Sequence, residues 1–182
     1  MHTSLDAFVA GPAGEMDWIK IDDEMFELVG KLTDAADTAL YGRVTYEMMD
    51  SYWPAAGRQP NASKHDIEHS TWYNNAHKVV LSGTMKSTEA NNITIIADNV
   101  AGEIEKLKNQ PGRDILIFGS PGAVHSLMEY NLIDDYWLFI NPVILGKGIP
   151  LFAKIKHKTA LQLAATKLFS CGVAALHYTV AR

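Results

Sequence analysis

The sequence predicts an α/β fold with a mostly parallel sheet and an antiparallel pair of strands at its end. Short apolar runs alternate along the chain with segments of helical periodicity, the pattern of strand–helix–strand units with right-handed crossovers. The clearest unit runs from Asp114 to Tyr130, where an apolar run, a glycine turn and a helix start follow one another. Two further strand-like segments, 161–169 and 173–181, are separated by a turn so short that they must pair antiparallel.

The first half of the chain divides into strands and helices at its turn residues. Apolar runs between these turns predict strands at 2–10, 38–41, 77–82 and 92–97. Helical spacing predicts one helix that Asp22 and Asp23 open and that reaches about Ala36, a second at 44–52 closed by Pro54, and a polar third at 62–76. The strand at 2–10 carries a motif from its first residues, so we expect it to be central in the sheet, and a native start upstream of Met1 stays open.

The second half continues the alternation. We expect Asp98 to cap a helix that ends at Gln110, before the stop signal Pro111-Gly112. The strand of the central unit follows, then its helix, then a long strand at 133–141. Residues 142–148 are punctuated by glycine and predict a loop.

The central unit can aim backbone groups at an anion. Its four apolar residues 115–118 predict a strand buried on both faces. Ser120 supplies a hydroxyl N-cap and Pro121 suits the first helical position. A phosphate or pyrophosphate can sit at such a turn, where free N–H groups and the positive end of a helix meet, although an ordinary strand-to-helix turn has the same sequence pattern.

Composition places the chain among soluble globular proteins of one domain, over residues 1–182. It has 182 residues, 47% hydrophobic and 20% charged, with a net charge of −5, which argues against a nucleic-acid or membrane surface as partner. The single cysteine, Cys171, cannot form an internal disulfide. The sequence has no signal-peptide pattern and no apolar run near 18 residues, so we expect a cytoplasmic protein.

Three strand ends carry small or phosphate-binding residues: 42–45, 81–84 and 119–122. In an open α/β sheet, ligands bind outside the carboxyl ends of the strands, so these three ends can converge on one extended phosphorylated cofactor. Arg43 offers a forked donor for a phosphate, and Ser82 and Thr84 offer hydroxyls. No G-x-G-x-x-G or Walker A motif occurs.

These motifs together resemble the dihydrofolate reductase superfamily, in particular the branch that contains the reductase domain of bacterial riboflavin biosynthesis. The resemblance covers nearly the whole chain and rests on residues 4–12, 14–18, 42–47, 132–136 and 142–148. It implies a three-layer α/β/α fold, NADPH as cofactor and a homodimer. It also implies an NADPH-dependent oxidoreductase whose substrate is pterin-like, as for dihydrofolate reductase, or ribosylamino-pyrimidine-like, as for 5-amino-6-(5-phosphoribosylamino)uracil reductase.

The resemblance assigns roles to residues at each motif. Asp6 would face the nicotinamide and substrate pocket as a catalytic residue, with Trp18 on a covering loop, while Pro142 and Gly146 would shape the substrate side. The cofactor phosphates would be held at the strand ends by Gly42, Arg43, Thr45, Ser82, Gly119, Ser120 and Gly122.

The sequence departs from the family pattern at two of these places. Family members usually have glycine where this chain has Ala7, and the riboflavin-pathway reductases have an acid where this chain has Phe118. A dihydrofolate reductase also needs a carboxylate on its first helix. Candidates are present, but at the helix start, where capping is the expected role: Asp22, Asp23 and Glu27.

Two other readings stay open. The segment His65-Asp66-Ile67-Glu68-His69 matches the H-x-x-E-H zinc motif, in which two histidines would bind the metal and Glu68 would act as base; it would need a third protein ligand. The other alternative is a nucleotide-binding protein of the same fold without catalysis. Metal content and turnover of NADPH separate these readings from a reductase.

Overall fold

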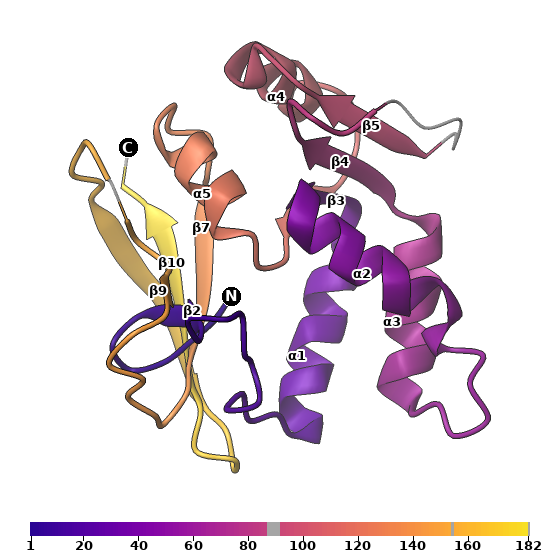
Figure 1. Cartoon of the computed structure of the whole chain (residues 1–182), viewed down its shortest axis with the longest axis vertical. Coiled ribbons are helices and arrows are strands. Elements are labelled where there is room, and N and C mark those ends of the chain that lie inside the picture. Colours follow the sequence, from indigo (N-terminus) through magenta and orange to yellow (C-terminus); the bar gives the residue numbers. More distant parts are fainter. Residues whose placement is uncertain (87–91, 154, 182) are drawn as a thin grey trace. The chain divides into compact units, whose positions relative to one another are not determined.

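The computed structural model describes residues 1–86, 92–153 and 155–181, and its chain divides into two compact units. Unit 1 comprises Met1–Met25 together with Val124–Arg182, and unit 2 comprises Phe26–Ala123. Figure 1 labels the elements of both. Each unit has its own sheet and is described by itself.

Unit 2 contains a parallel four-stranded sheet with the strand order β5-β4-β3-β6. All three of its pairings are parallel. The strands are β3 (Ala36–Gly42), β4 (His77–Leu81), β5 (Ile93–Ile96) and β6 (Asp114–Ile117). They correspond to the predicted strands at 38–41, 77–82, 92–97 and 115–118, and the predicted parallel pairing is confirmed. The expected burial of the last strand on both faces is wrong, because β6 is at the end of the strand order and its apolar side chains are only partly buried.

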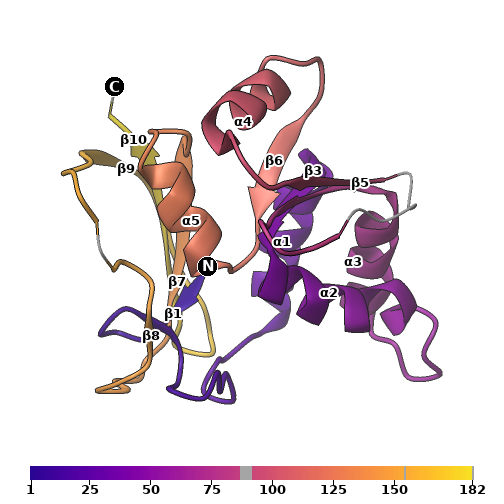
Figure 2. The same ribbon diagram turned by 45° about the horizontal axis from the view of Figure 1, so that its top comes forward.

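Helices lie on both sides of these strands. The chain crosses from β3 to β4 through α2 (Arg43–Ala56) and α3 (Lys64–Asn75), and from β5 to β6 through α4 (Val100–Lys108). Figure 2 shows α4 on the side of the sheet away from α2 and α3. This arrangement gives unit 2 three layers, as predicted.

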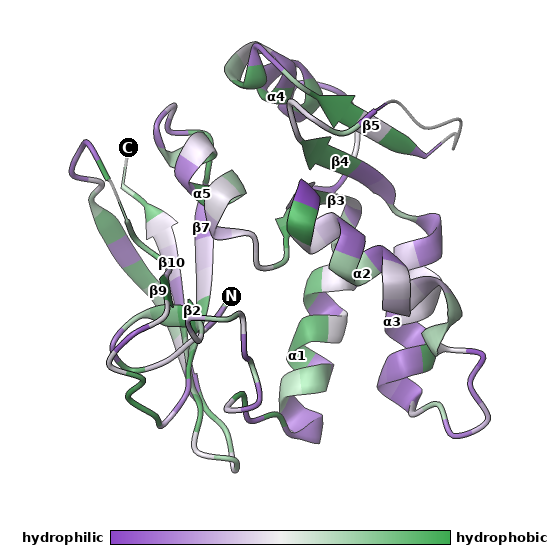
Figure 3. Cartoon of the chain, viewed as in Figure 1, coloured by the Kyte–Doolittle hydropathy of each residue, from purple (hydrophilic) through white to green (hydrophobic). Residues whose placement is uncertain are grey.

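The face beneath α2 and α3 carries an aromatic core. Tyr41 of β3, Tyr46 of α2 and Tyr73 of α3 pack together with Ala39 and Val80, and all five are buried. The helix α3 itself is largely hydrophilic, as predicted, and Figure 3 shows this. It buries only a few side chains, which include Tyr73 and His69.

Unit 1 contains a mixed four-stranded sheet with the order β1-β7-β10-β9. The strand β1 pairs with β7 in parallel, and β10 pairs antiparallel with both β7 and β9, which confirms the predicted C-terminal hairpin. The strands are β1 (His2–Thr3), β7 (Asp135–Ile140), β9 (Leu161–Leu168) and β10 (Ala174–Val180). A second pair in this unit joins β2 (Phe8–Ala10) to β8 (Ile149–Pro150).

Two helices contain residues of both units. The helix α1 (Asp23–Asp34) starts close to the predicted position, and α5 (Pro121–Met128) is the helix of the central unit. Within the described part of the chain, no helix is both long and apolar enough to cross a membrane.

Three details of the prediction were wrong. The segment 2–10 is two short strands, because a turn at residues 4–7 takes the chain out of the sheet, and β1 lies at the edge of its four-stranded sheet rather than in its centre. Pro54 lies inside α2, near its end, where a missing N–H removes only one hydrogen bond of the helix. The helix α4 is preceded by Asn99 in a left-handed conformation, so Asp98 is not its N-cap.

Candidate functional site

Three of the predicted strand ends meet at the carboxyl edge of the sheet in unit 2. Gly42, the last residue of β3, is level with Leu81, the last residue of β4. On the other side of β3, Leu40 is level with Ile117 at the end of β6. Ser82 and Gly119 therefore follow their strands at the same edge, as the sequence predicted.

Ser120 connects two of these strand ends. The Gly42 N–H donates a hydrogen bond of 2.7 Å to Ser120 Oγ, across 78 residues of sequence. A Cβ on Gly42 would lie 2.8 Å from that oxygen, so the close approach requires glycine at position 42. Ser120 had been predicted to cap α5, but its hydroxyl is turned to the end of β3 instead.

The backbone of the turn after β6 has an uncommon shape. Gly119 and Ser120 both have positive φ, at 63° and 61°, and Ser120 is the residue for which this left-handed conformation is costly. The hydrogen bond from Gly42 compensates part of that cost. Gly119 also lies next to α2, because a Cβ on it would be 3.7 Å from the Thr45 methyl group.

Two helices begin at this edge with their positive ends unneutralised. The N-cap of α2 is Gly42, which has no capping side chain, and neither α2 nor α5 has an acidic residue in its first turn. Gly122 in the first turn of α5 is exposed, and a Cβ there would meet nothing within 4 Å. Such an edge attracts an anion and lets it approach the backbone.

Arg43 is present at the edge but already has a partner. Its Nη1 donates to both carboxylate oxygens of Glu47, one turn later in α2, at 3.0 and 3.1 Å. Both side chains are largely exposed, at 44% and 53%. An exposed pair of this kind is weak and exchanges readily, so the guanidinium can turn to another anion.

Ser82 serves the turn that follows β4. Its hydroxyl oxygen accepts hydrogen bonds from the backbone N–H groups of Thr84 and Met85, at 3.2 and 2.9 Å. The Ser82 hydroxyl oxygen is thus engaged in a local turn, and its phosphate-binding role stays a prediction.

The substrate-side residues of the prediction all belong to unit 1, where Asp6 holds a loop in place. Its carboxylate accepts hydrogen bonds from the backbone N–H groups of Leu145 (3.1 Å) and Gly146 (2.8 Å). Hydrogen bonding by Ser4 and by these two N–H groups lowers the pKa of Asp6 below its usual value, against the opposing effect of desolvation. Asp6 is thus ionised near neutral pH, and Gly146 provides the positive φ of 73° that the loop needs.

Asn141 is an organising residue that the sequence analysis missed. It is fully buried. Its amide nitrogen donates to the carbonyls of Thr3 and Phe139, while its amide oxygen accepts from the Lys20 N–H at 2.8 Å. It thereby fixes the loop that contains Trp18 and the turn at Pro142. A polar residue between a long apolar run and a proline was the available signal.

Trp18 lies on that loop and is partly buried, and its role on a covering loop stays a prediction. Its indole N–H donates to the Glu15 carbonyl at 3.1 Å.

Asp22 caps the helix α1. Its carboxylate accepts hydrogen bonds from the N–H of Met25 in α1 and from Ser170 and Cys171. The expected capping role of Asp22 is therefore confirmed.

The structure shows the local conformation or packing at both departures from the family pattern. Ala7 has a φ of 63°, the left-handed conformation that glycine adopts without cost, so the bend after Asp6 is made with an alanine under strain. Phe118 belongs to an aromatic cluster in unit 2, where its ring packs edge-on against His69 and Trp72, with centroids 5.4 and 5.5 Å away.

The histidines of the H-x-x-E-H segment belong to the same cluster. His65 stacks on Phe26 with ring centroids 3.9 Å apart, and His69 packs on Trp53 at 4.0 Å. Burial lowers the pKa of His69 to about 4. Among the described residues, no group of three or more histidine, cysteine or acidic side chains could hold a metal ion, so the third ligand that the zinc reading needs is not found there.

Comparison with known proteins gives a consistent match over the chain. A model of the RibD C-terminal domain family matches residues 1–175. The uncharacterized protein YyaP of Bacillus subtilis (strain 168) is 33% identical over 180 residues, which are 98% of this chain and 91% of YyaP.

Solved structures with the same fold include two reductases. The diaminohydroxyphosphoribosylaminopyrimidine deaminase/5-amino-6-(5-phosphoribosylamino)uracil reductase of Thermotoga maritima matches 99% of this chain and 55% of its own, with a TM-score of 0.67 and 13% identity. Dihydrofolate reductase from Enterococcus faecalis, in complex with NADP(H) and RAB-propyl, matches 100% of this chain and 94% of its own, with a TM-score of 0.63 and 15% identity. The predicted dihydrofolate reductase-like fold is confirmed.

The strain at Ala7 predicts a stabilising substitution. Ala7→Gly should remove about 1–2 kcal/mol of left-handed strain and add about 0.4–1 kcal/mol of backbone entropy to the unfolded chain. The free energy of unfolding should therefore rise by about 0.5–1 kcal/mol, measured by urea denaturation. Ala55→Gly in the helix α2 is the matched control and should lower it by about the same amount. A loss of stability in both variants would show that Ala7 is not strained.

The hydrogen bond between Gly42 and Ser120 predicts a destabilising substitution. Ser120→Ala leaves the Gly42 N–H without its acceptor, so the free energy of unfolding should fall by about 1–3 kcal/mol. Ser51→Ala removes an exposed hydroxyl on α2 and should change it by less than about 0.5 kcal/mol. Equal effects of the two substitutions in urea denaturation would rule out a structural role for the Ser120 hydroxyl.

Proposed function

Because the chain belongs to the RibD C-terminal domain family, we propose that it is a reductase that uses NADPH to reduce a small heterocycle, pterin-like or ribosylamino-pyrimidine-like. The family and the dihydrofolate reductase-like fold support an oxidoreductase in general. One observation carries the choice of cofactor. Three strand ends, two helix N-termini and an arginine converge at the carboxyl edge of unit 2, and the nearby first turns contain no acidic residue.

The residues at this edge fit an extended phosphorylated cofactor. The turn at Gly119, Ser120 and Gly122 leads into the start of α5, whose positive end would stabilise a pyrophosphate. At the start of α2, Thr45 would offer a backbone N–H, with Ser82 at the neighbouring strand end. The Gly42 N–H is already donated to Ser120 Oγ, so Gly42 would contribute a close approach of the backbone and not a hydrogen bond. Arg43 suits a terminal phosphate, because its guanidinium is exposed and held only by a weak ion pair.

The substrate would be held by residues of unit 1. We assign this role to Asp6, Trp18, Pro142 and Gly146. Because the pKa of Asp6 is lowered, its carboxylate would accept a hydrogen bond from an N–H group of a heterocycle and would not donate a proton. NADPH, when bound, would supply the hydride. The contribution of the chain is to bind and orient both molecules and to exclude water.

A second function is favoured by one observation. Both oxygens of the Asp6 carboxylate already accept hydrogen bonds from the backbone, and no other proton donor stands out in the described part of the motif loops. The same geometry would suit a protein that binds NADPH without reducing a substrate. Oxidation of NADPH in the presence of a pterin or a ribosylamino-pyrimidine distinguishes the two functions, because a binding protein would oxidise none with either acceptor.

Arg43 sets the expected preference for NADPH over NADH. Arg43→Ala removes the donor for the 2′-phosphate and should weaken NADPH binding by about ten- to a hundred-fold, equivalent to about 1.5–3 kcal/mol, while NADH binding stays the same. Glu47→Gln removes the competing carboxylate and should strengthen NADPH binding a few-fold. Calorimetric titration with both cofactors, at two salt concentrations, measures these effects.

The control for Arg43 is another exposed arginine of unit 2. Arg58→Ala removes a side chain that donates to the Pro54 carbonyl and should leave both affinities unchanged. Equal losses of NADPH and NADH affinity in Arg43→Ala would contradict a phosphate contact.

A substitution at Asp6 tests whether this residue acts in catalysis or in cofactor binding. Asp6→Asn should lower turnover and leave NADPH affinity nearly unchanged, because the cofactor residues belong to unit 2. A role in loop anchoring alone makes a different prediction for stability. Because the folded-state pKa is lowered, the contribution of Asp6 to stability is present at neutral pH and is lost as the pH falls through that pKa. If Asp6→Asn turned over normally, and if its melting temperature were lower than that of the wild type at neutral pH but equal in acid, Asp6 would only anchor the loop.

A further inference from the structure

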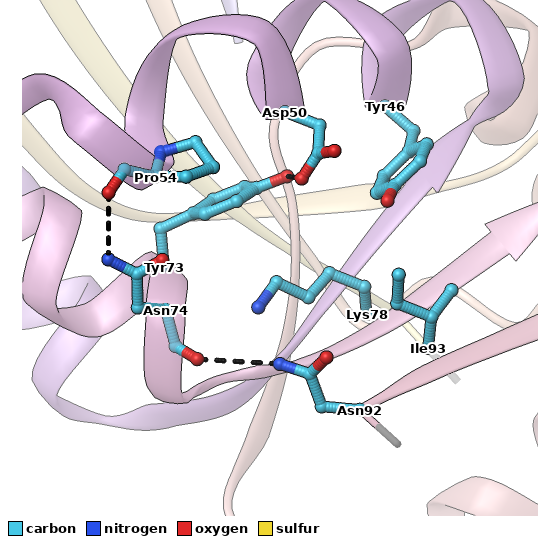
Figure 4. Close-up of a pocket in the computed structure, with 8 residues that line it drawn as sticks. All are labelled: Tyr46, Asp50, Pro54, Tyr73, Asn74, Lys78, Asn92 and Ile93. Carbon is cyan, nitrogen blue, oxygen red and sulfur yellow. Dashed lines mark hydrogen bonds between the residues drawn. The ribbon is translucent and has the colours of Figure 1, made fainter. Parts of the chain in front are cut away.

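We propose that unit 2 has a second ligand site, at the amino end of its parallel sheet, which binds a small monocarboxylate through the ammonium group of Lys78. The site is a pocket of about 420 Å³, which we call the Lys78 pocket. Figure 4 shows the residues that line it: Tyr46, Asp50, Pro54, Tyr73, Asn74, Lys78, Asn92 and Ile93.

The Lys78 pocket lies away from the proposed cofactor edge. Lys78 is the second residue of β4 and Ile93 is the first residue of β5, so both are at the amino ends of their strands. Ser82, at the cofactor edge, follows the carboxyl end of β4 and is four residues from Lys78, roughly 13 Å along an extended strand. The two sites are therefore independent proposals.

Lys78 is a buried lysine whose charge is only partly compensated by the residues around it. The residue is only 4% exposed, and its ammonium nitrogen lies 4.7 Å from the centre of the Tyr73 ring. Within the described part of the chain, that nitrogen has no ion pair and no hydrogen bond. Burial lowers the pKa of Lys78, and the charge of Asp50 offsets only part of that effect.

The lysine points into the pocket. In Figure 4 its nitrogen lies in the open space among the side chains of Tyr73, Asn74 and Asn92. An anion that entered this space could contact the ammonium group directly.

Asp50 is the candidate counter-ion in the pocket, but its carboxylate is hydrogen-bonded to Tyr73 and forms no ion pair with Lys78. Its carboxylate accepts a hydrogen bond of 3.1 Å from the Tyr73 hydroxyl. Burial, with a further contribution from Asp50, raises the pKa of Tyr46 to about 12, so that hydroxyl also stays protonated beside the carboxylate. Asp50 raises the pKa of Lys78 by its charge, yet its oxygens are more than 4 Å from the ammonium nitrogen, since no salt bridge forms.

The position of Asp50 selects for the charge of the ligand. Lys78 and Asp50 together give the pocket a net charge of zero. A ligand with one negative charge would therefore be attracted by the ammonium group and repelled by a single carboxylate. A phosphate with nearly two charges would be both attracted and repelled more strongly, but it would lose more hydration on entry and leave a larger net negative charge in the pocket. A monocarboxylate is therefore favoured over a phosphate.

The Lys78 ammonium group is the donor that the pocket leaves for a ligand. The Asn92 amide nitrogen already donates to the carbonyls of Asn74 and Ala76, and that of Asn74 donates to the Pro54 carbonyl. A carboxylate, which is an acceptor only, would complement the three N–H groups of the ammonium.

The remaining walls suit the body of an organic acid. Pro54 and Ile93 supply apolar surface to the pocket. A pocket of this size, with one charged anchor and apolar walls, is typical of small-molecule sites. Sodium benzoate is the probe that combines one carboxylate with a compact apolar group.

The test is an NMR titration of isotopically labelled protein with sodium benzoate, at an ionic strength held constant with sodium chloride. We expect saturable shifts at the Lys78 side chain and at the backbone amides of Asn74 and Ile93. The lowered pKa of Lys78 should rise toward its ordinary value of 10.5 when benzoate is bound, because an anion stabilises the charged form. The absence of a saturable shift at Lys78 would overturn the proposal.

Variants give the second arm of the test. Lys78→Met keeps the length of the side chain without the charge, and its affinity for benzoate should be at least about ten-fold weaker, with NADPH affinity unchanged. Lys64→Met removes an exposed lysine of the same unit and should have no effect on benzoate binding. Unchanged affinity in Lys78→Met would contradict the assignment of Lys78.

Two further measurements keep the proposal testable whatever the variants do. If Lys78→Met does not fold, Lys78→Arg retains the charge and should bind benzoate within a few-fold of the wild type, while the titration of the wild-type lysine needs no variant. Inorganic phosphate should bind at least about ten-fold more weakly than benzoate. Equal or tighter binding of phosphate would overturn the choice of a monocarboxylate.

Discussion

The hydrogen bond from the Gly42 N–H to Ser120 Oγ is the constraint on which the candidate cofactor site depends. It joins the end of β3 to the turn after β6 and so brings the starts of α2 and α5 to one edge of the sheet in unit 2. It also requires a glycine at position 42, because the serine oxygen fills the place of a Cβ. The left-handed backbone of Ser120 is a cost that this arrangement carries for the sake of the site, a common feature of functional turns.

Positive charge lies at both ends of the strands of unit 2, where the two proposed anion sites are placed. At the carboxyl end, the positive ends of two helices are joined by Arg43, whose partner Glu47 keeps the guanidinium near the edge without binding it firmly. At the amino end, Lys78 is buried, and the nearby carboxylate of Asp50 forms no ion pair with it. The first site would be exposed and sensitive to salt, whereas the second would depend on the burial of Lys78.

Local sequence patterns predicted the strands, the parallel pairing, the C-terminal hairpin and the convergence of 42–45, 81–84 and 119–122, because these follow from apolar periodicity and from the rule that parallel strands end at the same edge. They did not predict side-chain partners between segments far apart in sequence. Ser120 was expected to cap its own helix and instead binds Gly42, and Asn141 was overlooked although it ties three segments together. The buried Lys78 had no signal, since a lysine in a strand is usually exposed.

The most direct measurement of the central claim is an amide NMR titration of the wild-type protein with NADPH. The account predicts saturable shifts at the carboxyl edge of unit 2, at the backbone amides of Gly42, Thr45, Ser82, Gly119 and Gly122, with the amides of the Lys78 pocket left unchanged. Saturable shifts confined to the Lys78 pocket, or no saturable shift at the carboxyl edge, would contradict it.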